Sequence, residues 1–144
     1  MYLSFAEYQS MGGTLTQTTF NDFEFDAETV VDWYTFGRLK KFDSSDYPEA
    51  LKKCMYHIIK LIENQAVLNG MATASASGAS DSGVMSTIAS QSNDGVSVSY
   101  NVLSAKDLLD SNTKAVEQTI QRYLAYVVDS LGRKVLYRGI YPDE

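Results

Sequence analysis

Apolar residues recur at three- and four-residue steps in three long stretches of the chain, which is the spacing of one helix face. The first stretch runs from Thr18 or Thr19 to about Phe36, the second from Asp46 to Asn69, and the third from Asn112 to Leu131. Helices of about 20 residues with single apolar faces bury those faces best against one another. The pattern predicts a mainly α fold, a small bundle of three long helices.

Capping residues set the expected ends of these helices. Ser4 and Glu7 have capping-box spacing, so a short N-terminal helix of about two turns is expected before the first long helix. Asp46 and Pro48 suit the first turn of the second long helix. A preceding turn is expected over residues 104–110. Glycines follow the predicted C-terminal ends, at Gly37, Gly70 and Gly132.

The segment between the second and third long helices has a different composition. Of the 23 residues from Met71 to Asn93, 14 are Ala, Ser or Gly, which favours a flexible insert. From Val84 to Tyr100, apolar and small polar residues alternate around the turn sequence Asn93–Gly95. This alternation predicts a β-hairpin inserted between the second and third long helices. Residues 70–101 are therefore expected to be a flexible insert with a hairpin.

The last residues, 133–144, are predicted to be an extended C-terminal tail of the single domain 1–144. The tail carries apolar side chains for which the nearby sequence offers no cover, so it is a candidate docking segment. Its candidate docking residues are Val135, Leu136, Tyr137, Arg138, Ile140 and Tyr141.

Composition excludes several classes of protein. With 44% hydrophobic and 21% charged residues, the 144-residue chain is expected to fold as one domain. Its 12 bases and 18 acids give a net charge of −6, which disfavours binding to duplex DNA through neutralisation of the phosphates. Because the chain has a single cysteine and a single histidine, it cannot form an internal disulfide or a zinc site of cysteines and histidines. Without a leader or a membrane-spanning stretch, an intracellular, metal-free domain is expected.

Charge is segregated along the chain. Residues 1–37 hold six acids and no bases, whereas residues 38–60 hold six bases against three acids. Such segregation suits acidic and basic helices that lie side by side in one fold. It equally suits a ring in which the acidic face of one copy meets the basic face of the next. The candidate basic residues for such an interface are Lys40, Lys41, Lys52 and Lys53.

Few residues offer catalytic chemistry. Cys54 and His57 lie three residues apart on the second long helix, which permits a nucleophile–base pair, but mid-helix positions in an apolar stripe are usually buried and inert. Carboxylates four residues apart in the first long helix suit acid–base work or a divalent ion, and equally a solvated helix face. The chain has no Gly-rich phosphate loop and no nucleophile elbow. We therefore expect no enzyme, no cofactor and no metal.

Three aromatic residues, Phe25, Trp33 and Phe36, lie on a second side of the first long helix. Either the short N-terminal helix covers this side, or it is an interface with another protein, since Trp and Phe are frequent interface anchors. Acids such as Asp32 accompany the aromatics and disfavour single-stranded nucleic acid.

Five phrases of the sequence, in this order and spacing, resemble the head–tail connector (adaptor, or head-completion) proteins of long-tailed double-stranded DNA phages and of prophages of Gram-positive bacteria. The resemblance covers almost the whole chain except the Ala/Ser/Gly insert. The phrases are residues 2–9 with Gly12 and Gly13, residues 31–39, residues 48–55, residues 93–100 and residues 136–140.

The resemblance implies a structural protein that forms a ring, commonly of about twelve copies, beneath the portal. Such a ring extends the DNA channel without binding DNA specifically, and it presents a platform for a downstream connector or tail-completion protein. The expected location is the head–tail interface of the virion, after assembly in the host cytoplasm, with no membrane. Alternatives are another virion subunit, such as a tail-completion or scaffold protein, or a nucleic-acid-binding module.

For the ring, Phe25, Trp33, Phe36 and Asp32 are expected to meet the four lysines of a neighbouring copy. The hairpin, with Val96, Val98 and Tyr100, is expected to pair with its neighbours around the ring. The tail is expected to dock on the portal by strand addition.

Overall fold

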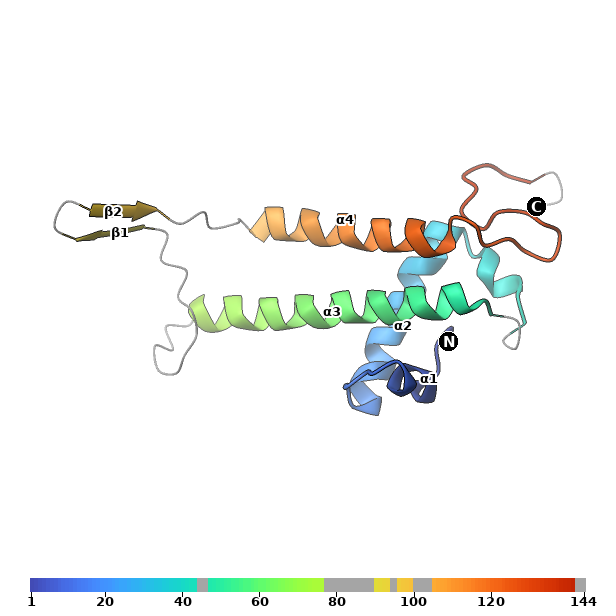
Figure 1. The fold of residues 1–144 in the computed structure, drawn as a ribbon, viewed down its shortest axis with the longest axis horizontal. Helices are drawn as coiled ribbons and strands as arrows, with labels where there is room; N and C mark the ends of the chain where they lie inside the picture. Colours follow the sequence, from blue (N-terminus) through green and yellow to red (C-terminus); the bar gives the residue numbers. More distant parts are fainter. Residues whose placement is uncertain (44–46, 77–89, 94–95, 100–104, 142–144) are drawn as a thin grey trace.

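The computed structural model describes residues 1–43, 47–76, 90–93, 96–99 and 105–141. These residues form four α-helices, α1 (Phe5–Ser10), α2 (Gln17–Thr35), α3 (Glu49–Ala76) and α4 (Ala105–Leu124), with a short 3₁₀ helix, η1 (Arg38–Lys41), after α2. The chain is thus a helical protein, as its periodicity predicts. In Figure 1, α3 and α4 lie side by side while α2 runs across α3, and α3 makes the most extensive contacts with both.

The N-terminal ends of the first two helices follow the local sequence. The Ser4 hydroxyl accepts from the Glu7 backbone N–H, and the Glu7 carboxylate accepts from the Ser4 N–H at 2.9 Å, which completes the predicted capping box. The Thr16 hydroxyl caps α2. At the other end of α2, Phe36 takes the left-handed conformation one residue earlier than expected, with φ 55°, and Gly37 follows with φ 68°.

The later helices end at different places from those predicted. Helix α3 continues through Gly70 to Ala76, because one glycine costs a helix only about 1 kcal/mol relative to alanine. Helix α4 begins at Ala105 without the expected break and ends at Leu124 rather than Leu131. Beyond it, Val128 pairs with Lys134 in an isolated antiparallel bridge, which a continuing helix would exclude.

The predicted fold class is wrong in its β-hairpin. The helical body formed by residues 1–43, 47–76 and 105–141 contains no strand. A short ribbon of β1 (Ser90–Asn93) and β2 (Val96–Ser99), with Ser90 opposite Ser99, lies beyond the ends of α3 and α4 in Figure 1. Its extensive contacts are between its own two strands, and no helix among the described residues makes extensive contacts with it. Alternation predicts a packed strand only where another surface buries the apolar side. The expected first-strand residues 84–89 and Tyr100 lie outside the described residues.

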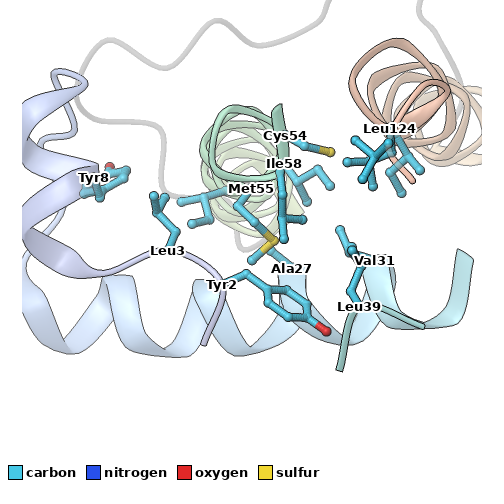
Figure 2. Packing of buried hydrophobic residues seen from close by; sticks show 14 of the residues in the cluster. Tyr2, Leu3, Tyr8, Ala27, Val31, Leu39, Cys54, Met55, Ile58 and Leu124 are labelled. Atoms are coloured by element: carbon cyan, nitrogen blue, oxygen red, sulfur yellow. The ribbon is translucent and has the colours of Figure 1, made fainter. Parts of the chain in front are cut away.

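Helix α3 lies at the centre of the hydrophobic core. Figure 2 shows side chains of α3 between the N-terminal segment, α2 and α4, with Met55 near Leu3 and Ala27 and Cys54 on the side of Leu124. The side chains of α3 in this core are fully buried. They are Leu51, Cys54, Met55, Ile58 and Ile59. Burial of side chains of this size stabilises the fold by about 1.5–3 kcal/mol each.

Tyr8 of α1 holds the loop that leads into α2. Its ring is fully buried and packs on Phe20 at 4.9 Å between centroids. Its hydroxyl accepts from the backbone N–H groups of Thr14 and Leu15 at 3.3 and 3.4 Å. Gly13 lies directly against the ring, and a Cβ at that position would overlap ring atoms of Tyr8. The loop therefore requires glycine at residue 13 for close approach.

We expect Gly13→Ala to lower the free energy of unfolding by about 1–3 kcal/mol, because the added methyl group must displace the packed Tyr8 ring. Urea denaturation followed by circular dichroism measures this change. Gly37→Ala is the comparison, since a Cβ at Gly37 meets no atom and only the positive φ opposes it. An unchanged free energy of unfolding in Gly13→Ala would show that the Tyr8 contact does not require glycine at residue 13.

Candidate interaction surfaces

A row of carboxylates on α2 binds the N-terminal segment. The Glu24 carboxylate accepts the backbone N–H of Tyr2 at 2.8 Å, and Glu28 pairs with the Met1 amino group at 2.6 Å. The Asp32 carboxylate accepts the hydroxyl of Tyr2. These acids are spaced four residues apart, so one helix face presents them all. Their role is structural. The sequence alone left three possibilities for these carboxylates: acid–base chemistry, a divalent ion or a solvated helix face.

Burial and hydrogen bonding shift the acidity of this region. Burial raises the pKa of Glu24 above its usual value, although the Tyr2 N–H opposes the shift. Burial, together with the bond to Asp32, also raises the pKa of Tyr2. In contrast, hydrogen bonds from Lys52 and Ser4 lower the pKa of Glu7 to about 2. The carboxylate of Glu7 therefore stays charged at neutral pH and keeps its pair with Lys52.

At least two of the four lysines predicted for a subunit interface form ion pairs within the chain. Lys40 lies 2.9 Å from Asp32, and Lys52 lies 2.7 Å from Glu7. Lys41 and Lys53 are exposed. Some of the acids and bases that are segregated along the sequence therefore pair within one subunit. This outcome agrees with the alternative in which acidic and basic helices lie side by side in one fold.

The three aromatic residues of the predicted interface are exposed. Phe25 and Trp33 on α2 are 70% and 73% exposed, and Phe36 at the end of α2 is 60% exposed. The short N-terminal helix does not cover them, so that alternative is wrong. Phe36 holds its exposed position in a left-handed conformation that costs a non-glycine residue about 1–2 kcal/mol.

Two hollows lie beside Trp33 and Tyr34. One, of about 530 Å³, is lined by residues of α2, α4 and the C-terminal segment, including Glu117 and Arg138. The other, of about 410 Å³, lies between α2 and α4 and includes Val30 and Val116. Both hollows have Trp33 in their walls, so the aromatic surface continues into a groove between these helices.

The C-terminal segment is folded onto the helices rather than extended as a tail. Val135 is fully buried, and its N–H donates to the Val127 carbonyl at 3.1 Å. The buried Arg38 guanidinium donates to the carbonyls of Val135 at 3.3 Å, Tyr137, and Gly139 at 2.7 Å. The prediction of a tail without cover is wrong. Val135 is buried in the core of the helices, and the Arg38 guanidinium binds three backbone carbonyls of the segment.

Part of the predicted docking set remains accessible. Ile140 is 85% exposed and Tyr137 about half exposed, while Arg138 lies 3.9 Å from Glu117 of α4. Leu136 is half-buried against the core, and the ring of Tyr141 packs at a tilt against that of Tyr137, with 4.8 Å between ring centroids. Of the predicted hairpin residues, Val96 and Val98 lie in β2 and Tyr100 lies outside the described residues.

Cys54 and His57 face different surroundings. Cys54 is fully buried in the core, and burial raises the pKa of its thiol to about 12. His57 is exposed and stacks on Tyr123 of α4 at 5.3 Å. No hydrogen bond joins the two in the part of the chain that the structure describes. The geometry gives no support to a nucleophile–base pair.

Among the described residues, no group of three or more histidine, cysteine and acidic side chains is arranged to hold a metal ion. Within the same ranges, no helix has the length and apolar character needed to cross a membrane. Comparison of the chain with protein-family models, curated proteins and solved structures finds no match.

Sequence reasoning missed two features of these surfaces. Arg38 belongs to the basic segment 38–60 of the sequence, and nothing local indicates that it binds three carbonyls about 100 residues later in the chain. The outer face of α4 was also overlooked, although the spacing of Lys114, Gln118 and Arg122 places them on one side of a helix.

We expect Arg38→Lys to loosen the C-terminal segment while the helices stay folded. Lysine cannot reproduce the planar fork that binds several carbonyls, and each lost charged hydrogen bond contributes about 1.5–3 kcal/mol. Amide hydrogen exchange of Val135 and Tyr137 should become at least about tenfold faster. The control is Arg138→Lys, because this arginine side chain is 79% exposed. Unchanged exchange in Arg38→Lys would contradict the assignment.

We expect the thiol of Cys54 to react slowly with a maleimide or disulfide reagent in the native protein. The reagent needs the thiolate, which burial suppresses, and it must also reach the core. Reaction in urea should be faster by about two orders of magnitude or more. Rapid labelling of the native protein at neutral pH would show that Cys54 is accessible and would reopen the question of nucleophilic chemistry.

Proposed function

We propose that this protein is a structural subunit of a phage head–tail connector. Copies of the chain form a ring beneath the portal that extends the DNA channel and joins head to tail during virion assembly. Its partners are further copies of itself, the portal protein, and a downstream connector or tail-completion protein.

The observation that carries the proposal is the exposed aromatic surface of Phe25, Trp33 and Phe36. A side chain such as Trp33, 73% exposed beside a groove, is unfavourable in water and typical of a protein interface. Acids flank this surface on α2, and the whole chain has a net charge of −6. The partner is therefore more suitably a protein than a nucleic acid.

The sequence supports the same function. Its five phrases resemble connector proteins in their order and spacing, and they include part of the helical core, such as Leu3, Val31 and Met55. Among the described residues, neither a metal-binding group nor a Cys–His pair supports a catalytic function.

In this proposal, the C-terminal segment docks on the portal through its exposed side chains. Arg38 occupies the carbonyls of Tyr137 and Gly139, which removes acceptors that strand addition would need. Ile140 and Tyr137 remain available, and the folded segment presents them at low entropic cost. Docking by a preorganised loop therefore replaces the expected addition of an extended strand.

We expect Ile140→Asp to weaken binding to the portal ring of the same virus at least about tenfold, because a charge replaces an apolar contact. Deletion of the segment after Gly132 is unsuitable, since it removes Val135 from the core. Pull-down with purified portal and electron microscopy of the mixture measure the binding. The control is Val67→Asp on α3, where the side chain is also exposed.

Normal binding of Ile140→Asp would contradict the docking site alone. Failure of the wild-type protein to bind the portal would contradict the connector function. In that case, binding to tail structures or to a scaffold would favour the other virion roles, and salt-sensitive retention on DNA would favour a nucleic-acid-binding module.

A further inference from the structure

The exposed side of α2 carries acids and aromatics together. Asp22, Asp26, Thr29 and Trp33 follow one another at three- and four-residue steps, Phe25 lies beside Asp26 on the same side, and all five are exposed. We call these five residues the acidic–aromatic stripe. Among the described residues, Asp22 and Asp26 have no ion-pair partner, in contrast to the inward row of Glu24, Glu28 and Asp32.

The exposed side of α4 has the opposite charge. Lys114, Gln118, Gln121 and Arg122 lie on one helix face and are all exposed, and we call them the basic stripe. Neither Lys114 nor Arg122 is in an ion pair within the described residues. Two acids of α4 lie close to this stripe. Asp110 is exposed one turn before Lys114 on the same side of the helix, and the Glu117 carboxylate accepts from the Gln121 amide at 3.2 Å and lies 3.9 Å from Arg138.

The two stripes lie on different faces of the molecule. Helices α2 and α4 both pack on α3, and Figure 2 shows them against different sides of it. Phe20, Ala27 and Val31 place the buried side of α2 opposite its stripe, and Ile120 and Leu124 do the same for α4. Each stripe therefore points away from α3, and the two cannot meet within one subunit.

We propose that the acidic–aromatic stripe of one copy packs against the basic stripe of the next copy. This inference rests on the proposed ring and names the surfaces that build it. A contact between two different patches of the same chain is heterologous, and it repeats head to tail until a ring closes.

Charge and size both favour a second copy as the occupant. Two unpaired acids face two unpaired bases, which steers association and fixes its orientation. The stripes are similar in length, about 16 Å from Asp22 to Trp33 and about 12 Å from Lys114 to Arg122 at 1.5 Å per residue. Arginine also binds aromatic faces, so Trp33 and Phe25 suit a surface that carries Arg122.

This assignment replaces part of the interface expected from sequence. Lys40 and Lys52 are held by Asp32 and Glu7 of their own subunit, so their use between subunits would break existing pairs. The bases of α4 need no such exchange. The aromatic residues Phe25 and Trp33 keep the role that the sequence predicts for them.

Charge reversal on each stripe tests the contact. One variant carries Asp22→Lys and Asp26→Lys, and the other carries Lys114→Glu and Arg122→Glu. All four positions are exposed, so each variant should keep its fold, which circular dichroism checks. Sedimentation velocity at low and high salt measures assembly. Each variant alone should associate at least about tenfold more weakly than the wild type, because like charges then face each other.

An equimolar mixture of the two variants should restore assembly. In the mixture, the native acids of one variant meet the native bases of the other, and the reversed charges also meet as opposites. A further variant, Lys134→Glu with Asn64→Asp and Val67→Asp, has the same net charge as the base-reversed chain, changes only exposed positions outside both stripes, and should assemble like the wild type. High salt should weaken wild-type assembly.

Three results would overturn the inference: reversed variants that assemble normally, a mixture that does not recover, or a control that fails as badly as the α4 variant. A wild-type chain that stays monomeric, alone and in every mixture, would overturn it as well. Portal binding separates this inference from the proposed function. Wild-type portal binding with a failed charge reversal contradicts only these surfaces, whereas self-association without portal binding contradicts the connector function.

Discussion

Burial of α3 is the constraint on which the other contacts depend. Its side chains face the N-terminal segment, α2 and α4 at once, so every other helix has one side turned towards it (Figure 2). Among the described residues, the sides of α2 and α4 that are turned away from α3 have no other helix packed on them. That geometry leaves Phe25 and Trp33 exposed on α2 and the bases exposed on α4. The surfaces that we assign to assembly are therefore a consequence of how the core is built.

Electrostatic pairs hold the ends of the chain to this core. The row of Glu24, Glu28 and Asp32 binds the N-terminal residues, and Arg38 binds the C-terminal segment through backbone carbonyls. Buried charges are costly unless they are paired, and each of these has a partner. In the described residues, no buried side-chain polar atom lacks a hydrogen bond. Much of the charge segregation seen in the sequence is thus used within the subunit, and α4 and the outer face of α2 carry what remains.

The connector proposal and the stripe contact make different use of the same fold. A preorganised C-terminal segment presents Ile140 and Tyr137 towards a portal, while the helix faces on different sides of α3 offer a repeated contact between copies. Portal docking and the contact between copies both require a rigid folded subunit, and neither requires a reactive side chain. The inert environment of Cys54 is in keeping with that requirement.

Local sequence determined the existence and the beginnings of the first helices, because capping by Ser4 and Thr16 and a three- to four-residue apolar repeat act over a few neighbours. Tertiary structure decided where α4 ends, that Val135 is buried, and which carboxylates bind the N-terminal segment. In the described residues, the extensive contacts of strands β1 and β2 are with each other and not with the helices. These outcomes depend on residues up to about 100 positions apart, such as Arg38 and Gly139, whose meeting only the packed chain reveals.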